Sequence, residues 1–303
     1  MRVPVGVAPM SPTVTEPPVL ESVLFDVAYD GTLFHGFAPQ RDARTVHGVL
    51  LAAIREVDSS IADVRGASRT DARVHARGQL VAFDPARALP PAAWQAEVNR
   101  RLPEDVAVVR ARCVASGFVP RFEAAGKRYI YEVKVSSMRD PLERHRAWVV
   151  PFGVSPERVG GELAALVGTH DFRAFRRAAD RREDTVRTIA RAEVTATHPH
   201  LRIAVEGSGF LYNMVRIVVG TAVEVGANRR RPGAIARAIV SGARGDLGLT
   251  APPQGLCLDR VFLPGDDDLP RPFHEAGKNP RGPRVRGSAP IAPCDGDDER
   301  RPP

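Results

Sequence analysis

Apolar and polar positions alternate with two periods along the chain, and this separates predicted strands from predicted helices. A period of two over residues 22–29 predicts a strand with one buried face. Residues 46–57 instead carry apolar side chains at the spacing of a helix face, and Thr45 is suited to cap that helix. The same reasoning predicts further strands at residues 64–67, 79–83, 106–109, 128–135, 189–197, 201–206 and 255–261, and further helices at 91–101, 156–167 and 210–225.

The predicted elements fall into two halves of similar outline, residues 21–120 and 121–264, with the boundary near Arg121. Residues 1–20 and 265–303 flank these halves and differ from them in composition. Eight of the 39 residues from 265 to 303 are proline, mixed with charges of both signs and few large apolar side chains. We therefore expect a disordered leader before the first half and a disordered tail after the second.

One short connection between predicted strands carries a candidate for chemistry. Residues 68–76 read Ser-Arg-Thr-Asp-Ala-Arg-Val-His-Ala, which sets the Asp71 carboxylate between Arg69 and His75. Loops held by rigid strands are where reactive side chains are commonly found. Taken alone, an Arg-Thr-Asp sequence is more typical of a solvated turn with a local ion pair. Other segments of the chain are needed to distinguish such a turn from an active-site loop.

The charge of the chain favours a polyanionic partner. The formal net charge is +7 and the isoelectric point is about 9.9. The surplus does not come from the tail, because residues 265–303 carry seven Lys or Arg against eight Asp or Glu. Nucleic acid is the natural partner of such a basic body, although an arginine-rich composition alone would give the same charge.

Cysteine, histidine and hydropathy patterns argue against several classes of protein. Three widely separated cysteines, Cys113, Cys257 and Cys294, imply neither a disulfide framework nor a zinc site. The eight histidines show no metal-ligand spacing, so we expect no metal. No apolar run is long enough to span a membrane, and the N-terminus lacks the apolar core of a secretory signal. A cytoplasmic protein is the expectation.

Segments along residues 22–263 resemble, in order, the TruA-type tRNA pseudouridine synthase family. The resemblance rests on seven sequence motifs and on their order rather than on any one of them. They are YDGTLFHGF at 29–37, TVHGVL at 45–50, SRTDARVHA at 68–76, KRYIYEV at 127–133, TVRTI at 185–189, GFLYNMVR at 209–216 and APPQGLCL at 251–258.

The resemblance implies a fold, a reaction and partners. It implies an α+β fold of two ferredoxin-like halves that form a continuous, mainly antiparallel sheet flanked by helices. It implies isomerisation of uridine to pseudouridine in tRNA, in the anticodon arm at positions 38 to 40, without a cofactor. It also implies a homodimer, with one tRNA spanning both subunits.

The resemblance also assigns site residues. Asp71 takes the catalytic role, because one carboxylate can carry the covalent or proton-transfer work of this isomerisation. Arg69 is suited to hold a phosphate or to fill the space left by a flipped base. The resemblance places Tyr129 against the uracil and nominates Asp71 as the partner of Arg216, a pair that we expect to keep Asp71 ionised. Leu256 is a candidate for the apolar wall of the pocket, with Leu258 or ordinary core packing as the alternatives.

The chain departs from the family pattern at three places. Ser68 and Arg73 stand where the family usually has glycine, and Gly36-Phe37-Ala38 replaces the usual Gly-Trp-Gln. A side chain at position 73 restricts the loop and adds a positive charge near Asp71. Two alternatives therefore stay open: a catalytically impaired RNA-binding paralogue, and an unrelated enzyme on a ferredoxin-like fold.

Overall fold

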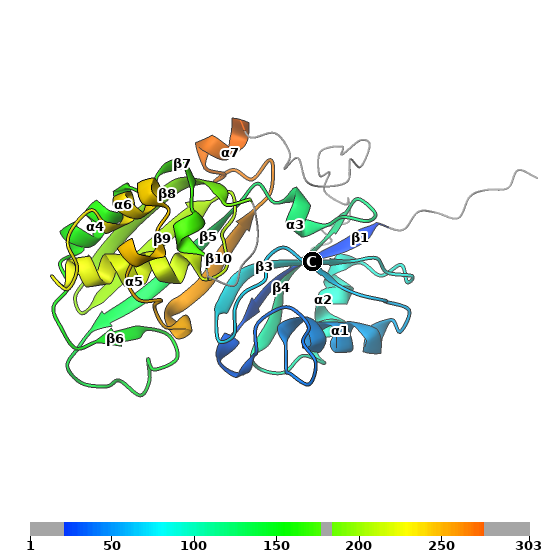
Figure 1. Ribbon diagram of the computed structural model, residues 1–303. Coiled ribbons are helices and arrows are strands. Elements are labelled where there is room, and N and C mark those ends of the chain that lie inside the picture. Colours follow the sequence, from blue (N-terminus) through cyan, green and yellow to red (C-terminus); the bar gives the residue numbers. More distant parts are fainter. Residues whose placement is uncertain (1–20, 177–183, 276–303) are drawn as a thin grey trace, which may run out of the picture.

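The computed structural model describes residues 21–176 and 184–275. The described residues form a 10-stranded sheet that runs through the whole molecule (Figure 1). Its strands are β1 (Ser22–Tyr29), β2 (Arg65–Gly66), β3 (His75–Phe83), β4 (Val106–Val114), β5 (Gly126–Val135), β6 (Trp148–Val150), β7 (Gly168–Asp171), β8 (Val186–Thr197), β9 (His200–Gly207) and β10 (Leu256–Phe262).

The helices pack beside this sheet, and the local sequence explains where several of them begin. The Thr45 side chain accepts a hydrogen bond from the Gly48 N–H at 3.2 Å, as expected of the cap of the first helix. Proline opens three of the helices, at a position where the missing N–H costs nothing. The helices are α1 (Val46–Val57), α2 (Pro91–Asn99), α3 (Pro120–Glu123), α4 (Pro156–Ala164), α5 (Met214–Gly226), α6 (Ala234–Ser241) and α7 (Arg271–Glu275).

Two halves with the same topology share the sheet. In the first half, the order along the chain is β1, α1, β2, β3, α2, β4, and the strands lie in the order β4-β1-β3-β2. In the second half the corresponding elements are β5, α4, β8, β9, α5 and β10, with β6, β7 and α6 inserted between them, and the strands lie in the order β10-β5-β9-β8. Each half is thus a βαββαβ unit, which confirms the predicted α+β fold with two ferredoxin-like halves.

The halves meet along a short seam. Strands β3 and β10 pair in parallel at two positions, Cys257 with His75 and Leu258 with Ala76. The other pairs along the main order of the sheet are antiparallel. Because β3 and β10 both begin at this seam, the segments that precede them come together at one end of it.

The two faces of the sheet differ in chemistry. On one face the Trp94 ring of α2 lies 5.1 Å from the Phe83 ring, and α1, α2 and α5 cover that face in Figure 1. On the other face the charged side chains pair between strands, as in the 2.7 Å contact between Arg112 and Asp26. Further pairs on this face are Arg128 with Glu206 and Arg202 with Glu132.

Two predictions about element boundaries were wrong. The helix predicted at 210–225 begins only at Met214, because Asn213 adopts a left-handed conformation (φ 63°) that breaks the helix before it. The tail predicted to be disordered from residue 265 instead continues in an ordered form to α7. Leu269 and Phe273 are buried there and pack on Phe262, and Arg260 of β10 pairs with Asp268, so apolar and charged contacts both hold the segment against the sheet.

Other predictions are not decided by the fold. The leader 1–20 and residues 276–303 of the tail lie outside the described residues. The boundary between the halves at 120/121 stays a prediction, and α3 lies at that place in the chain. Among the described residues, no helix is long and apolar enough to cross a membrane.

Candidate active site at the seam between the two halves

A cavity of about 710 Å³ opens where the two halves meet. The connection from β2 to β3, residues 67–74, forms much of one wall and is called the Asp71 loop below. The second half contributes residues from β5, the segment before α5 and the first residue of β10. Four of the predicted site residues, Arg69, Asp71, Tyr129 and Leu256, line this cavity together.

The first half holds the Asp71 loop through buried polar contacts. The Gln79 side chain accepts a hydrogen bond from the Ser68 N–H at 3.0 Å and donates one to the Ser68 carbonyl at 2.6 Å. The Tyr29 and Thr70 hydroxyls lie 2.7 Å apart, and the Phe37 N–H donates to the Thr70 carbonyl at 3.1 Å. The loop is therefore anchored to β1 and β3 immediately before Asp71.

Strand β5 holds the same loop from the second half. Lys127 Nζ donates to the Ala67 carbonyl at 2.8 Å, and the Tyr129 hydroxyl lies 3.0 Å from Ser68 Oγ. Residues 127 and 129 share one face of the strand, so consecutive side chains on that face meet consecutive residues of the loop. Neither contact is predictable from local sequence, because Lys127 and Ala67, and Tyr129 and Ser68, are about 60 positions apart.

Arg216, in the first turn of α5, contacts Asp71 from the second half. Its Nη1 is 3.5 Å from Asp71 Oδ2, and the two side chains are 15% and 14% exposed. The guanidinium also donates to the Ala251 carbonyl at 2.7 Å and to Asn213 Oδ1 at 2.8 Å. These two bonds fix the orientation of Arg216, and the predicted pairing of Arg216 with Asp71 is present.

The electrostatic balance at Asp71 is set by burial and by the Arg216 charge. Burial raises the pKa of the Asp71 carboxyl above its ordinary value, and the nearby Arg216 charge lowers it by less. The Arg216 charge therefore offsets only part of the cost of burial, and the expectation that this pair keeps Asp71 ionised stays a prediction. A carboxylate with a raised pKa is more basic than a solvated one, which suits a group that forms or breaks bonds to protons or carbon.

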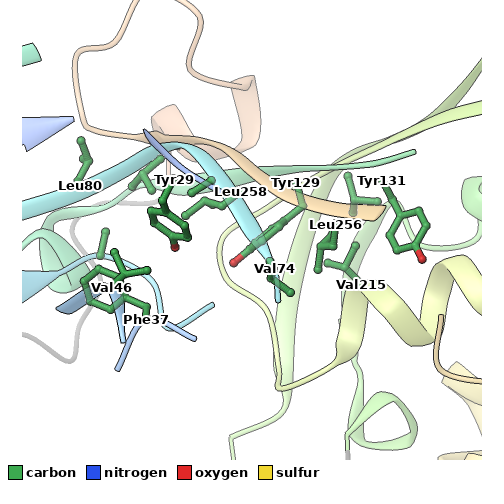
Figure 2. Close-up of a cluster of buried hydrophobic side chains, with 14 of the residues drawn as sticks. Tyr29, Phe37, Val46, Val74, Leu80, Tyr129, Tyr131, Val215, Leu256 and Leu258 are labelled. Atoms are coloured by element: carbon green, nitrogen blue, oxygen red, sulfur yellow. The ribbon is translucent and has the colours of Figure 1, made fainter. Parts of the chain in front are cut away.

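Tyr129 forms the floor of the cavity on the second half. Its side chain is buried, and its ring meets the edge of the Phe210 ring at 5.2 Å between centroids. In Figure 2 Tyr129 and Tyr131 project from β5, with Leu256 and Val215 lying between them. Burial raises the pKa of the Tyr129 phenol, so the hydroxyl keeps its proton and is available as a hydrogen-bond donor.

Leu256 and Leu258 have different surroundings. Leu256 lines the cavity, whereas Leu258 lies two residues further along β10 in the core and is fully buried. Of the two leucines that the sequence left open, Leu256 is thus the one in a position to form an apolar wall.

Arg69 is exposed on the lining of the cavity, and His75 is not part of that lining. The His75 ring is buried, with Nδ1 3.0 Å from Asp30 Oδ1. Arg73 is exposed and has a φ of 66°, the left-handed region that glycine adopts without strain. The usual glycine of the family pattern would fit this backbone, so Arg73 keeps the loop conformation at some energetic cost.

Lys127 is the other unusual ionisable group beside the cavity. Burial lowers the pKa of its ammonium to about 8, and the nearby Arg121 and Arg187 charges act in the same direction. Its charge is therefore sensitive to an anion that enters the cavity.

Two arginines of the basic run at residues 229–231 have contacts within the fold. The Arg229 guanidinium lies over the Phe152 ring at 4.8 Å, and Arg230 pairs with Glu224 at 2.8 Å. Within the described part of the chain, no group of three or more His, Cys, Asp or Glu side chains is placed to hold a metal ion.

The sequence is similar to known proteins over most of its length. A family model described as tRNA pseudouridine synthase matches residues 27–123 and 163–264. The tRNA pseudouridine synthase A of Geobacter sp. (strain M21) is 37% identical over 246 residues, which are 81% of this chain and 100% of that protein. The protein of the same name from Geobacillus kaustophilus (strain HTA426) is 40% identical over 237 residues, 78% of this chain and 92% of that protein. Among solved structures, a Cbf5-Nop10-Gar1 complex has a TM-score of 0.31 and 17% identity, over 70% of this chain and 50% of that chain.

Proposed function

The chain belongs to the tRNA pseudouridine synthase family and isomerises uridine to pseudouridine in tRNA, and we propose that Asp71 is its catalytic residue. We further propose that its targets are the uridines at positions 38 to 40 of the anticodon arm, as the family resemblance implies. The observation that supports Asp71 most strongly is its place in the cavity: a partly buried carboxylate with a raised pKa, held beside Arg216.

The reaction exchanges one bond of uridine for another. The bond from ribose C1′ to N1 of uracil breaks, the freed base turns, and C1′ joins C5 instead. C5 loses its proton and N1 gains one, so the product is an isomer and no electrons are transferred to another molecule. The base has to leave the stack to reach a buried carboxylate, and the cavity of about 710 Å³ is large enough for one nucleoside.

An ionised Asp71 can serve this reaction in three ways. Its carboxylate can attack C1′ of the sugar, add to the uracil ring, or remove a proton from the ribose. All three need a carboxylate that is deprotonated and fixed in direction. Arg216 meets both needs, because its charge offsets part of the cost of burial and its own contacts keep it in place.

The remaining site residues are proposed to bind and enclose the nucleoside. Tyr129 offers an aromatic face to the uracil and a phenol proton for a hydrogen bond. Leu256 closes the pocket with an apolar surface that excludes water. Arg69 is exposed at the cavity and is suited to contact an RNA phosphate or to occupy the place of the flipped base.

We propose that the partner is tRNA, that two copies of the chain form a homodimer on it, and that the protein acts in the cytoplasm. The net charge of +7 supports a polyanionic partner. The dimer and the compartment rest on the family resemblance alone.

Position-specific mapping of pseudouridine tests the function. An unmodified tRNA transcript with uridines at 38, 39 and 40 is incubated with the protein, and transcripts with cytidine at these positions serve as controls. We expect conversion at one or more of the three positions and none in the controls. Conversion elsewhere would contradict the proposed target, and tight binding of tRNA without product would favour the impaired RNA-binding paralogue.

A further inference from the structure

Two residues of the Asp71 loop pair their hydroxyl with the phenol of a tyrosine. Thr70 Oγ1 lies 2.7 Å from the Tyr29 hydroxyl, and Ser68 Oγ lies 3.0 Å from the Tyr129 hydroxyl. Tyr29 is not among the residues that line the cavity, whereas Tyr129 is. The two contacts have the same chemistry, but one ends in the core and the other ends at the proposed uracil site.

The Ser68 hydroxyl is held at a fixed point. The backbone N–H and carbonyl of Ser68 are both bound by the Gln79 side chain, and the neighbouring Ala67 carbonyl is bound by Lys127. Ser68 itself is 8% exposed, so the side chain has little freedom to turn away from Tyr129. The glycine that the family pattern usually has here would leave the Tyr129 phenol without this partner.

We propose that Ser68 is a positioning residue, whose hydroxyl orients the Tyr129 phenol toward the uracil during catalysis. The proposal rests on the proposed function. It assigns to a residue that departs from the family pattern a task at the reaction site of this chain.

The physical basis is the hydrogen-bonding capacity of a phenol. The Tyr129 hydroxyl has one proton and accepts through its lone pairs. If it donates to Ser68, its lone pairs face the cavity; if it accepts from Ser68, its proton faces the cavity. In both cases the contact fixes the orientation of the Tyr129 O–H bond. A hydrogen-bonding group that is already oriented does not have to be reorganised when the base turns.

A double-mutant cycle between Ser68 and Tyr129 tests the proposal. We expect Ser68→Ala to lower kcat on an unmodified tRNA transcript by about fivefold, the size of one uncharged hydrogen bond, with KM changed by less than about twofold. In the Tyr129→Phe background the same substitution should change kcat by less than about 1.5-fold, because the phenol is already absent. Ser68→Thr keeps the hydroxyl and should restore most of the activity.

The second hydroxyl pair provides the matched control. Tyr29→Phe removes the phenol that pairs with Thr70, and its effect on kcat should be the same in the wild-type and Tyr129→Phe backgrounds, because this contact does not include Tyr129. Losses that add independently in the Ser68 and Tyr129 cycle, or a kcat of Ser68→Ala equal to that of wild type, would overturn the proposal.

A measurement without tRNA separates this proposal from the proposed function. Tyrosine labelled with ¹³C at Cζ reports the hydrogen bonding of each phenol by NMR, and Tyr129→Phe identifies the Tyr129 signal. Ser68→Ala should shift this signal, and Tyr29→Phe should leave it in place. An unshifted signal would contradict the positioning by Ser68 even in an active enzyme. A shifted signal in a protein that forms no pseudouridine would support the contact and reject the proposed function.

Discussion

The two walls of the cavity are built from different kinds of structure. The Asp71 loop presents polar groups, its backbone is bound by side chains of β3 and β5, and its Thr70 hydroxyl contacts Tyr29 of β1. The opposite wall is formed by the side chains of Tyr129, Val215 and Leu256, which come from a strand, the start of a helix and the start of another strand (Figure 2). The loop provides the carboxylate, and the side chains of the helix and strands form the apolar wall of the pocket.

This difference explains how a loop can hold a reactive group. A free loop of eight residues would sample many conformations, and each would place Asp71 differently. Here both halves bind the loop, so its position depends on how the halves are joined along the short seam of β3 and β10. Substitutions of the loop side chains that lie at the cavity should therefore change turnover, whereas substitutions in the opposite wall should change turnover and stability together.

The largest expected effect comes from Arg216, the charge that the second half brings to the loop. Arg216→Ala should lower kcat on the order of 100-fold and leave the Kd for tRNA within about threefold, because the carboxylate loses its partner and its orientation. The pKa of Asp71 should rise further, so part of the activity should return as the pH is raised. Single-turnover rates and filter binding measure both quantities. Arg216→Lys, which keeps the charge, should be less impaired, and equal losses of binding and turnover would argue against this role.

The next effect distinguishes two leucines of β10. Leu256→Ala should lower kcat/KM by about tenfold, because it opens the apolar wall to water. Leu258→Ala removes the same atoms from the core and should cost about 2–5 kcal/mol of stability, with kcat/KM changed by less than about twofold in the folded fraction. The pair is compared by thermal unfolding and by initial rates. A larger loss of kcat/KM in Leu258→Ala than in Leu256→Ala would contradict the assignment of Leu256 to the pocket wall.

A smaller effect concerns the energetic cost of the buried carboxylate. Because the pKa of Asp71 is raised in the folded protein, its contribution favours the folded state below the ordinary pKa of aspartate and is lost as the pH rises through the raised value. Asp71→Asn should therefore be more stable than wild type at pH 7, and the difference should shrink toward pH 4. Each 1 kcal/mol would appear as about 2–4 °C in Tm for a protein of this size. Asp268→Asn, an exposed partner of Arg260, is the control. A difference in stability between Asp71→Asn and wild type that grows on acidification would contradict a raised pKa of Asp71.

The smallest effect is expected from Arg73. Arg73→Gly relieves a left-handed backbone conformation and should stabilise the protein by up to about 1 kcal/mol, with kcat changed by less than about twofold. Thermal unfolding of the two proteins measures the difference. A clear loss of stability in the glycine variant would show that the Arg73 side chain contributes more to the loop than its backbone strain costs.

The sequence predicted the fold and most of the site residues for identifiable reasons. The period of two in 22–29 and the helical spacing after Thr45 are local signals, and both elements formed as predicted. Asp71, Arg69, Tyr129 and Leu256 were chosen from motifs that resemble one family, and they meet in one cavity. Their roles in catalysis and binding stay predictions.

The sequence could not predict features that depend on contacts between distant residues. Ser68 and Tyr129 are 61 positions apart, and nothing in their surroundings indicates that the two hydroxyls meet. The net rise of the Asp71 pKa depends on how deeply the loop is buried, which only the packed structure determines. The start of α5 was missed because Asn213 takes a conformation that helical periodicity does not report.

The most direct test of the account is the formation of pseudouridine by Asp71→Asn under single-turnover conditions, with excess protein over an unmodified tRNA transcript. Wild type and Asp268→Asn are measured beside it, together with the Kd of each protein for the transcript. We expect wild-type affinity and no detectable pseudouridine for Asp71→Asn, because an amide replaces the carboxylate without changing its shape. Pseudouridine formed by Asp71→Asn at a rate close to that of wild type would contradict the claim that the carboxylate of this loop carries the reaction.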